Sequence, residues 1–345
     1  MLKRIVIAAS IGVGVLIVSA IGFAVAYQSF LATPLNVPED GLEFSVPSGT
    51  AFSTVASRLE DDGILDNARW LKLHGRLTGK AAKIQAGEYR IRTGTTPAEF
   101  VDQLTSGNVI LHAFTIVEGW NRWELMAALR REPRLVHTLD EEDWPEFLEE
   151  LGTDATSPEG LFLPETYRFP GNTTDRELLK QAYELLQKTL NAEWEARATA
   201  LPFDSPYEAL ILASIIEKET AKADERPQIA GVFVRRLEKR MRLQTDPTVI
   251  YGIGPDFNGN LTRRDLRSDT PYNTYTRGGL PPTPIAMAGQ AAINAALHPE
   301  DGETLYFVAT GLGDGSHAFS VTKDEHDRAV RAYLARLREK RSRSE

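Results

Sequence analysis

The feature that most constrains this chain is an uncharged, mainly apolar segment near its N-terminus. Ile5–Tyr27 runs for 23 residues without Asp, Glu, Lys or Arg, about the length needed to cross a hydrocarbon layer ~30 Å thick. Lys3 and Arg4 precede it, and no Lys or Arg follows until Arg58. By the positive-inside rule, residues 1–4 form a cytoplasmic tail, residues 5–27 span the membrane, and the rest lies outside.

A cleaved signal peptide is the alternative to a retained anchor. Its apolar region would usually run for ~7–15 residues and end at a small-x-small site, which Ala24–Ala26 fits loosely. The longer apolar run favours the anchor. We therefore expect a single-pass protein of the plasma (inner) membrane, with most of the chain on the outer, periplasmic side.

Composition argues against several classes of protein. The chain of 345 residues has no Cys, and its six His residues show no HExxH-type spacing, so we predict no disulfide, no metal and no cofactor. The net charge of −9 argues against a nucleic-acid partner, because phosphate binding normally needs a basic face. Arg235–Arg242 is a basic exception, which we interpret as a solvated helix face.

The region after the anchor predicts a linker and a small α/β domain. Residues 28–41 contain prolines and have no strong periodicity, which is typical of a tether. Within residues 42–117, alternation predicts strands at Leu42–Val46 and Gly87–Arg92, with two helices between them. A further helix and a strand at Val109–Val117 complete this domain.

One stretch of this domain, VPSGTAFSTVASRLEDDGIL (residues 46–65), is similar to the small glycan-binding LysM-like module. Thr50 is expected to cap the helix inside it. The resemblance implies contact with glycan. A spacer that only positions the second domain is the alternative.

Residues 118–345 predict a larger, mainly helical domain with a short β hairpin, so the expected fold class is α+β. The predicted helices are one capped by Asn121, then Asp175–Ala198, a helix capped by Ser205, Pro227–Met241, Gly289–His298 and a last helix capped by Thr322; Thr304–Ala309 and His317–Val321 form the hairpin. No strand is predicted in PEGLFLPETYRFP, residues 158–170, a segment of aromatics and prolines.

The helix capped by Ser205 is unusually apolar. Pro206 suits its first position and Glu208 completes a capping box. Between Ala209 and Ile216 only Ser214 is polar, so the helix should lie inside the domain.

Glu217 comes at the end of this buried helix. Apolar surroundings raise the pKa of a carboxyl group and keep a proton available near neutral pH. Glu217 is therefore a candidate proton donor. A simple ion pair with Lys218 or Arg226 at the helix end is the alternative, and periodicity alone does not choose between the two.

Several polar and aromatic residues near this helix in the sequence are candidates for contact with sugar. Aromatic faces pack on pyranose C–H groups, and amides bond the hydroxyls and N-acetyl groups. Packing within the domain is the alternative for the tyrosines, and a cap or buried acceptor is the alternative for the carboxylate of the PEGLFLPETYRFP segment. The candidates are Gln244, Asp246, Tyr251, Tyr272, Asn273, Tyr275 and Glu159.

The motifs ASIIEKETA, RLQTDPTVIYG, TPYNTYT, GLPP and HAFS, in that order, resemble the YceG-like (MltG-type) endolytic murein transglycosylase family. The resemblance implies a membrane-anchored lyase that cuts peptidoglycan strands between N-acetylmuramic acid and N-acetylglucosamine, terminating nascent strands beside the cell-wall synthesis enzymes. It places the catalytic glutamate on the first Glu of the E-K-E-T run, here Glu217. It also implies that one acid suffices, because the sugar's own 6-hydroxyl attacks the anomeric carbon and leaves a 1,6-anhydro end.

Two other functions stay open from the sequence. If Glu217 worked with a second carboxylate such as Glu159, Glu219 or Asp246, the protein would be a muramidase-type hydrolase. If no carboxylate acted as an acid, it would be a non-catalytic scaffold that binds peptidoglycan.

Overall fold

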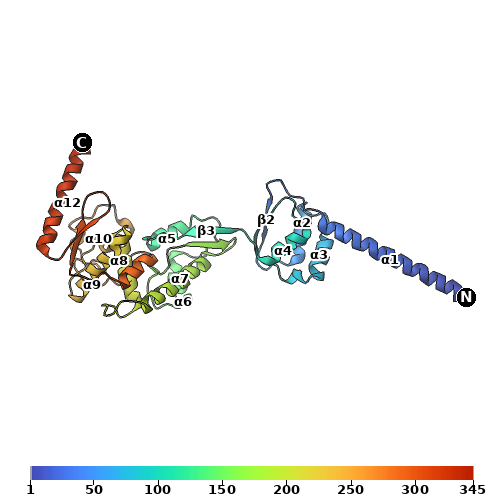
Figure 1. The fold of residues 1–345 in the computed structure, drawn as a ribbon, viewed down its shortest axis with the longest axis horizontal. Coiled ribbons are helices and arrows are strands. Elements are labelled where there is room, and N and C mark those ends of the chain that lie inside the picture. The colour runs from blue at the N-terminus through green and yellow to red at the C-terminus, as the bar shows by residue number, and fades with distance from the viewer. Residues whose placement is uncertain (1, 345) are drawn as a thin grey trace. The chain divides into compact units, whose positions relative to one another are not determined.

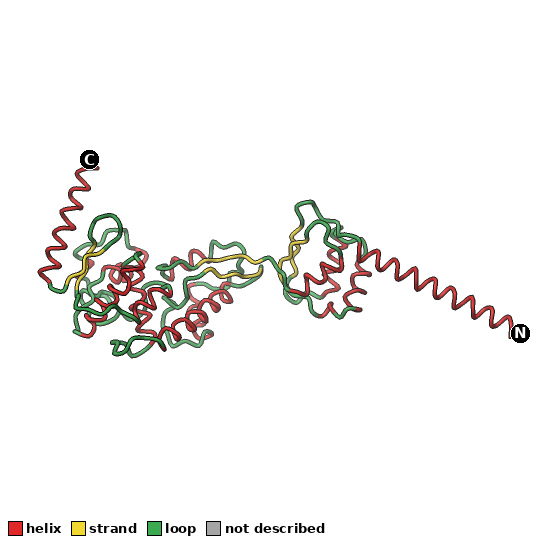
Figure 2. Tube along the Cα trace, in the orientation of Figure 1, coloured by secondary structure: helices red, strands yellow, loops and turns green. Residues whose placement is uncertain are grey.

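The computed structural model describes residues 2–344. Within them helices dominate, and the strands form three separate two-stranded sheets (Figure 2). The chain divides into two compact units, the first made of Met1–His112 with Arg168–Asn172, the second of Ala113–Tyr167 with Thr173–Glu345. The predicted α+β class is confirmed. The assignment of residues 42–117 to glycan contact and of residues 118–345 to catalysis stays a prediction.

The N-terminal helix α1 (Leu2–Ala32) contains the whole of the predicted span, residues 5–27. Among the described residues, Ser10–Ala32 is long and apolar enough to cross a membrane, by length and composition. The helix ends at Ala32 and therefore takes in the first residues of the predicted linker. The predicted tail begins at Met1, which lies outside the described residues.

The first unit combines one two-stranded sheet with short helices (Figure 1). After α1 its elements are β1 (Leu42–Val46), α2 (Phe52–Asp61), α3 (Ala68–Leu77), the 3-10 helix η1 (Lys80–Ala82), β2 (Gly87–Ile91) and α4 (Pro97–Ser106). β1 pairs antiparallel with β2, from Leu42 opposite Ile91 to Val46 opposite Gly87. The predicted strand–helix–helix–strand order is confirmed. Likeness to a LysM module stays a prediction.

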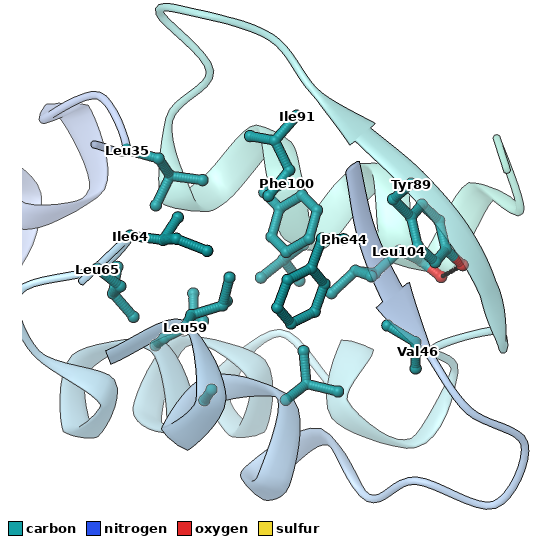
Figure 3. Close-up of a cluster of buried hydrophobic side chains, with 14 of the residues drawn as sticks. Leu35, Phe44, Val46, Leu59, Ile64, Leu65, Tyr89, Ile91, Phe100 and Leu104 are labelled. Carbon is teal, nitrogen blue, oxygen red and sulfur yellow. Dashed lines mark hydrogen bonds between the residues drawn. The ribbon is translucent and has the colours of Figure 1, made fainter. Parts of the chain in front are cut away.

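The core of the first unit lies between this sheet and its helices (Figure 3). Alternation along β1 turns Phe44 inward, and alternation along β2 does the same for Tyr89. Both rings meet Phe100 of α4 edge-on, with centroids 5.9 and 6.3 Å apart. Burying one such side chain contributes about 1.5–3 kcal/mol, so this small domain has a core of its own.

Thr50 does not cap α2, contrary to the prediction. Ala51 occupies the N-cap position and makes no side-chain hydrogen bond. Thr50 instead closes the preceding turn, in which its backbone N–H donates to the Pro47 carbonyl at 3.2 Å. Thr50 is therefore part of the turn, and the helix begins one residue later than predicted.

The second unit is mainly helical (Figure 1). Its elements are β3 (Leu111–Thr115), α5 (Arg122–Leu129), η2 (Glu141–Asp143), α6 (Trp144–Glu150), β4 (Thr166–Pro170), α7 (Asp175–Glu195), α8 (Pro206–Glu219), η3 (Ala223–Glu225), α9 (Arg226–Glu238), α10 (Asp246–Ile253), η4 (Gly254–Asp256), η5 (Asp265–Arg267), α11 (Gln290–Leu297), β5 (Tyr306–Ala309), β6 (His317–Ser320) and α12 (Lys323–Ser344). The predicted helices and the antiparallel β5–β6 hairpin are confirmed.

Strand β4 was missed from the sequence. It pairs with β3, and the division between the two units falls within both strands. Tyr167 and Phe169 are buried while their neighbours Thr166 and Arg168 are exposed, so the segment does alternate as a strand should. The prolines around this segment masked its two-residue alternation in the sequence.

Helix α8 lies at the centre of the second unit. It packs against α7, α9, α10 and α11, as an apolar helix must because every one of its sides avoids water. Every residue from Ala209 to Ile216 is buried. The C-terminal end of α8 is thereby held firmly among its neighbours.

The basic run Arg235–Arg242 is only in part the solvated face that we expected. Lys239, Arg240 and Arg242, which follow the end of α9, are exposed, whereas Arg235 and Arg236 on the helix make contacts inside the unit. Arg236 is only 7% exposed, and it donates to the carbonyls of Leu305 and Leu243, both at 2.7 Å. Arg235 donates to the Thr304 carbonyl at 2.8 Å. These guanidinium groups bind carbonyl oxygens beside the β5–β6 hairpin, a role for which their fixed fork of donors is suited.

Candidate active site

Helix α8 places Glu217 at the edge of the buried region. Ser205 is its N-cap and accepts the Glu208 N–H at 3.3 Å, and Pro206 takes the first position. The other half of the predicted capping box is absent, because the Glu208 carboxylate accepts the N–H of Asp204 at 2.7 Å instead. The helix nevertheless begins where the sequence predicted.

The carboxyl group of Glu217 is almost enclosed. Its side chain is 5% exposed. Oε2 accepts the backbone N–H of Gly289 at 3.0 Å, and Oε1 lies 3.4 Å from Arg226 Nη2. Arg226 Nη2 also lies 3.8 Å from Glu118 Oε2. One guanidinium therefore stands near two carboxyl groups.

These surroundings act on the pKa of Glu217 in opposite directions. Burial raises the pKa and has the largest effect, the Gly289 N–H lowers it, the negative charge of Glu118 raises it, and Arg226 lowers it. The net result is a pKa raised above the usual value for glutamate. Such a carboxyl can hold a proton where an exposed one would have lost it, as a general acid requires.

The ion-pair alternative is half correct. Lys218 does not pair with Glu217, because its Nζ donates to the Gly119 carbonyl at 3.0 Å. Arg226 does contact Glu217, at a distance longer than that of a strong charge-assisted hydrogen bond. Burial raises the pKa of Glu217 by more than the contact with Arg226 lowers it. Glu217 is therefore both an ion-pair partner and a candidate acid.

Two segments distant in sequence are tied to the end of α8. Ser214, fully buried, accepts the Ile285 N–H at 3.0 Å. Met287 donates its N–H to the Trp120 carbonyl at 2.7 Å and accepts the Gly119 N–H at 2.9 Å. These bonds place Gly289 and Glu118, which the sequence did not single out as site residues, beside Glu217.

A cavity of about 560 Å³ adjoins this end of the helix. Its lining is mostly apolar and aromatic and includes Asn121, Trp123, Lys218, Ile250, Tyr251 and Phe257. The Tyr251 ring packs against Trp123 with centroids 5.3 Å apart and against Tyr272 at 4.8 Å. Tyr251, a predicted sugar contact, thus belongs to an aromatic cluster beside a cavity of the size that ligands occupy.

The other predicted tyrosines are anchored by their hydroxyl groups. Tyr272 Oη lies 2.9 Å from Thr283 Oγ1. Tyr275 donates its hydroxyl to Asp246 at 2.6 Å, and burial together with this carboxylate raises the pKa of Tyr275. Gln244 is exposed, with a left-handed backbone at φ +53°. Within residues 2–344, none of the predicted sugar contacts forms a hydrogen bond or ion pair with Glu217.

Asn273 holds a loop in place. The residue is 0% exposed, and its Nδ2 donates to the carbonyls of Asp265, Leu266 and Ser268 at 2.7–3.3 Å. Its Oδ1 accepts the Tyr275 N–H at 2.9 Å. All the hydrogen-bonding groups of this amide are therefore used inside the protein, and none is open to a sugar.

Glu159 is a buried hydrogen-bond acceptor, which was the alternative to a sugar contact. The residue is 0% exposed, and Oε2 accepts the N–H of Arg122 at the start of α5 at 3.0 Å. Burial raises its pKa to about 7, against smaller opposing effects from Arg122 and Tyr251. Among the described residues Oε1 has no hydrogen-bond partner. This carboxyl group supports the wall that carries Tyr251.

Glu219, another candidate for a second carboxylate, points toward a different neighbour. Its carboxylate accepts a hydrogen bond from the Thr245 hydroxyl. Burial raises its pKa to about 6, and the nearby charge of Asp246 adds to the rise. Within the part of the chain that the structure describes, no cluster of three His, Asp or Glu side chains could hold a metal ion.

Known proteins of one family match this chain over most of its length. The model of the YceG-like family matches residues 44–332. The endolytic murein transglycosylase of Bacillus subtilis (strain 168) is 32% identical, with 93% of this chain and 92% of that protein covered. The endolytic murein transglycosylase of Streptococcus pneumoniae (strain D39) is 25% identical, with 89% of this chain but only 62% of that protein covered. The crystal structure of a YceG-like protein from Listeria monocytogenes is 28% identical, with a TM-score of 0.53 over 84% of this chain and 99% of that one.

Proposed function

The chain belongs to the YceG-like family, and from this we propose that it is a lytic transglycosylase that cleaves peptidoglycan strands with Glu217 as its acid. The observation that carries the proposal is the enclosure of this carboxyl group at the end of α8, with a raised pKa. The relatives from B. subtilis and S. pneumoniae, both named endolytic murein transglycosylases, support the same reaction class.

In this mechanism Glu217 first donates its proton to the glycosidic oxygen. As that bond breaks, the 6-hydroxyl of N-acetylmuramic acid attacks the anomeric carbon, and Glu217 takes the hydroxyl proton back. The products are a 1,6-anhydromuramic end and a free N-acetylglucosamine hydroxyl. The Gly289 N–H and Arg226 stabilise the carboxylate that exists between the two proton transfers.

The cavity beside α8 is the proposed site of the sugar units that flank the cleaved bond. Trp123 and Tyr251 offer aromatic faces there, and Asn121 offers a polar group. A cavity of about 560 Å³ holds a few sugar rings at most, as an enzyme acting on one linkage of a long strand needs.

The apolar part of α1 supports an anchor in the plasma membrane. With Lys3 and Arg4 on the cytoplasmic side, both compact units after α1 lie on the outer side, where peptidoglycan is assembled. We propose that the enzyme works there beside the cell-wall synthesis enzymes and terminates nascent strands.

The hydrolase alternative needs a second carboxylate at the cleaved bond. Of the three carboxylates considered from the sequence, Glu159 is fully enclosed, Glu219 is bonded to Thr245, and Asp246 accepts the Tyr275 hydroxyl at 2.6 Å. The carboxylate whose charge acts on the pKa of Glu217 is Glu118, half exposed and 3.8 Å from Arg226. Glu118 is therefore the carboxylate that we propose to test first for a hydrolase mechanism.

Glu217→Gln in the full-length protein tests the proposal. Isolated glycan strands are incubated with the purified variant, and mass spectrometry measures the anhydro ends. General acid catalysis is worth roughly 10²–10⁴-fold, so we expect at least a hundredfold loss with an unchanged melting temperature. Glu146→Gln, the same chemical change at a 72% exposed side chain of the second unit, is the matched control and should keep wild-type activity.

Running the reaction in ¹⁸O-labelled water separates the alternatives. A lyase incorporates no label, because no water attacks, whereas a hydrolase places one labelled oxygen on each new reducing end. Anhydro ends formed by Glu217→Gln at the wild-type rate would rule out Glu217 as the acid. Strand binding without any cleavage by the wild-type protein would support the scaffold.

A further inference from the structure

The C-terminal end of α1 packs against α3 through aromatic side chains. The ring of Trp70 in α3 lies 4.9 Å from Phe23, 5.8 Å from Tyr27 and 6.5 Å from Phe30, between centroids. The Tyr27 hydroxyl also lies 2.8 Å from His74 Nδ1. Figure 1 shows α3 beside the end of α1. α3 therefore lies at the depth of these residues in any membrane that α1 crosses.

That depth is the outer boundary of the bilayer. The hydrocarbon core takes about 20 helical residues, so a span that begins after Lys3 and Arg4 ends near Phe23. Tyr27 then lies among the lipid headgroups, where Trp and Tyr rings concentrate. This step rests on the membrane-spanning role proposed for α1.

The outward side of α3 carries an apolar strip next to α1. Trp70, Leu73 and Leu77 share one side of the helix at helical spacing. Leu77 is 67% exposed, although the opposite side of α3 is buried in the core of the unit. A large aliphatic side chain in that position costs little if lipid rather than water covers it.

Basic residues surround this strip in a chain that is acidic as a whole. Residues 67–87 contain no Asp or Glu but include Arg69, Lys72, Arg76, Lys80 and Lys83. Lys80 pairs with Asp102, and Lys72 donates to Ser57 at 2.7 Å. Within residues 2–344 the side chains of the other three make no hydrogen bond or ion pair. Three cations are thus free to bind an external anion.

We propose that α3 and η1 form a membrane-docking face that binds the anionic phospholipid headgroups of the bilayer holding α1. Leu73 and Leu77 enter the boundary between headgroups and acyl chains, and Arg69, Arg76 and Lys83 pair with phosphates. An amphipathic helix with aromatic and basic residues suits that position. Docking gives the first unit a second contact with the membrane besides α1.

A single fluorescent label reports the depth of this face. Because the natural chain has no Cys, Leu77→Cys in the full-length protein accepts one NBD dye. The labelled protein is placed in nanodiscs of phosphatidylcholine, alone or mixed with phosphatidylglycerol. We expect blue-shifted emission and quenching by headgroup spin labels in the anionic nanodiscs only. Adding Arg69→Glu and Arg76→Glu should abolish both signals.

Two control labels keep the outcomes distinct. Asn108 is exposed and lies between α4 and β3, where the chain leaves the unit on the side away from α1 (Figure 1). The dye on Asn108→Cys should therefore stay open to aqueous iodide. Val15→Cys lies in α1 and is 60% exposed there, so its dye should be lipid-quenched if α1 crosses the bilayer. A water-accessible dye at residue 15 would overturn the anchor and the docking face together.

The remaining outcomes concern the docking face alone. Lipid quenching at residue 15 with a water-accessible dye at residue 77 would overturn the docking face and leave the anchor standing. Quenching at residue 77 that does not depend on phosphatidylglycerol would overturn the role of the basic side chains. If charge reversal left this quenching unchanged but lowered co-sedimentation with isolated peptidoglycan, the partner would be the wall polymer and not lipid.

Discussion

Replacing Ser214 with alanine should weaken both the fold and the activity, because its hydroxyl ties α8 to the segment that carries Gly289. Ser214 is 0% exposed; its Oγ donates to the Ile211 carbonyl at 2.7 Å and accepts the Ile285 N–H at 3.0 Å. Gly289 follows in the same segment and donates its N–H to Glu217 at 3.0 Å. One bond in the core therefore supports a bond in the active site.

The size of the effect follows from the donor that is left without a partner. In Ser214→Ala the N–H of Ile285, a residue that is 2% exposed, loses its acceptor, which costs about 1–3 kcal/mol. Alanine is the better helix former by about 0.5 kcal/mol, so the free energy of unfolding should fall by about 0.5–2.5 kcal/mol. In a domain of this size that lowers Tm by about 1–10 °C.

Calorimetry of the full-length protein measures Tm, and the release of anhydro ends measures kcat. Ser342→Ala is the matched control, because Ser342 is an exposed helical serine whose Oγ donates to the Glu339 carbonyl at 2.9 Å; its effect should stay within about 0.5 kcal/mol. A wild-type Tm for Ser214→Ala would refute the bond to Ile285. A lower Tm with unchanged kcat and pH profile would refute its role in positioning Gly289.

The charges beside Glu217 should move the alkaline limb of the pH–rate profile in opposite directions. Arg226→Gln removes a cation that lowers the pKa of Glu217, so the limb should move to higher pH. Glu118→Gln removes an anion that raises this pKa, so the limb should move to lower pH. Shifts of the same sign in the two variants would contradict the arrangement. Burial raises the pKa of Glu159 from 4.5 to about 7, so its stabilising effect is complete below pH ~4.5 and about 3 kcal/mol is lost as the pH rises toward 7. Glu159→Gln should flatten that decline in thermal melts, and an equally steep decline would show that the carboxyl is not protonated in the fold.

Local signals in the sequence were enough to place most helices. Thr96 and Asn121 form the capping boxes that begin α4 and α5, and Ser205 caps α8. A helix cap forms between residues that are close in the chain, so it can be recognised from a short stretch of sequence. Thr50 shows the limit, since the turn before α2 competes for the same residue.

The surroundings of Glu217 could not be predicted in the same way. Glu118, Arg226 and Gly289 reach it from three separate segments. Gly289 contributes a backbone N–H, which has no side-chain signature, and the sequence marked it only as the start of a helix. Asn273 failed for a related reason, because an amide suited to bind sugar is equally suited to bind three backbone carbonyls.

From the sequence, an ion pair and a proton donor were alternative roles for Glu217. In the structure the two roles act together. A Glu217 paired closely with Arg226 and open to water would be deprotonated at neutral pH, whereas one in a wholly apolar pocket would not release its proton. The reaction needs both forms in turn. Burial favours the acid before the glycosidic bond breaks, and the Gly289 N–H and the weak contact at 3.4 Å with Arg226 favour the carboxylate that follows. Because Glu118 stands 3.8 Å from the same guanidinium, we expect the balance between Glu118 and Arg226 to set the pH at which the enzyme is most active.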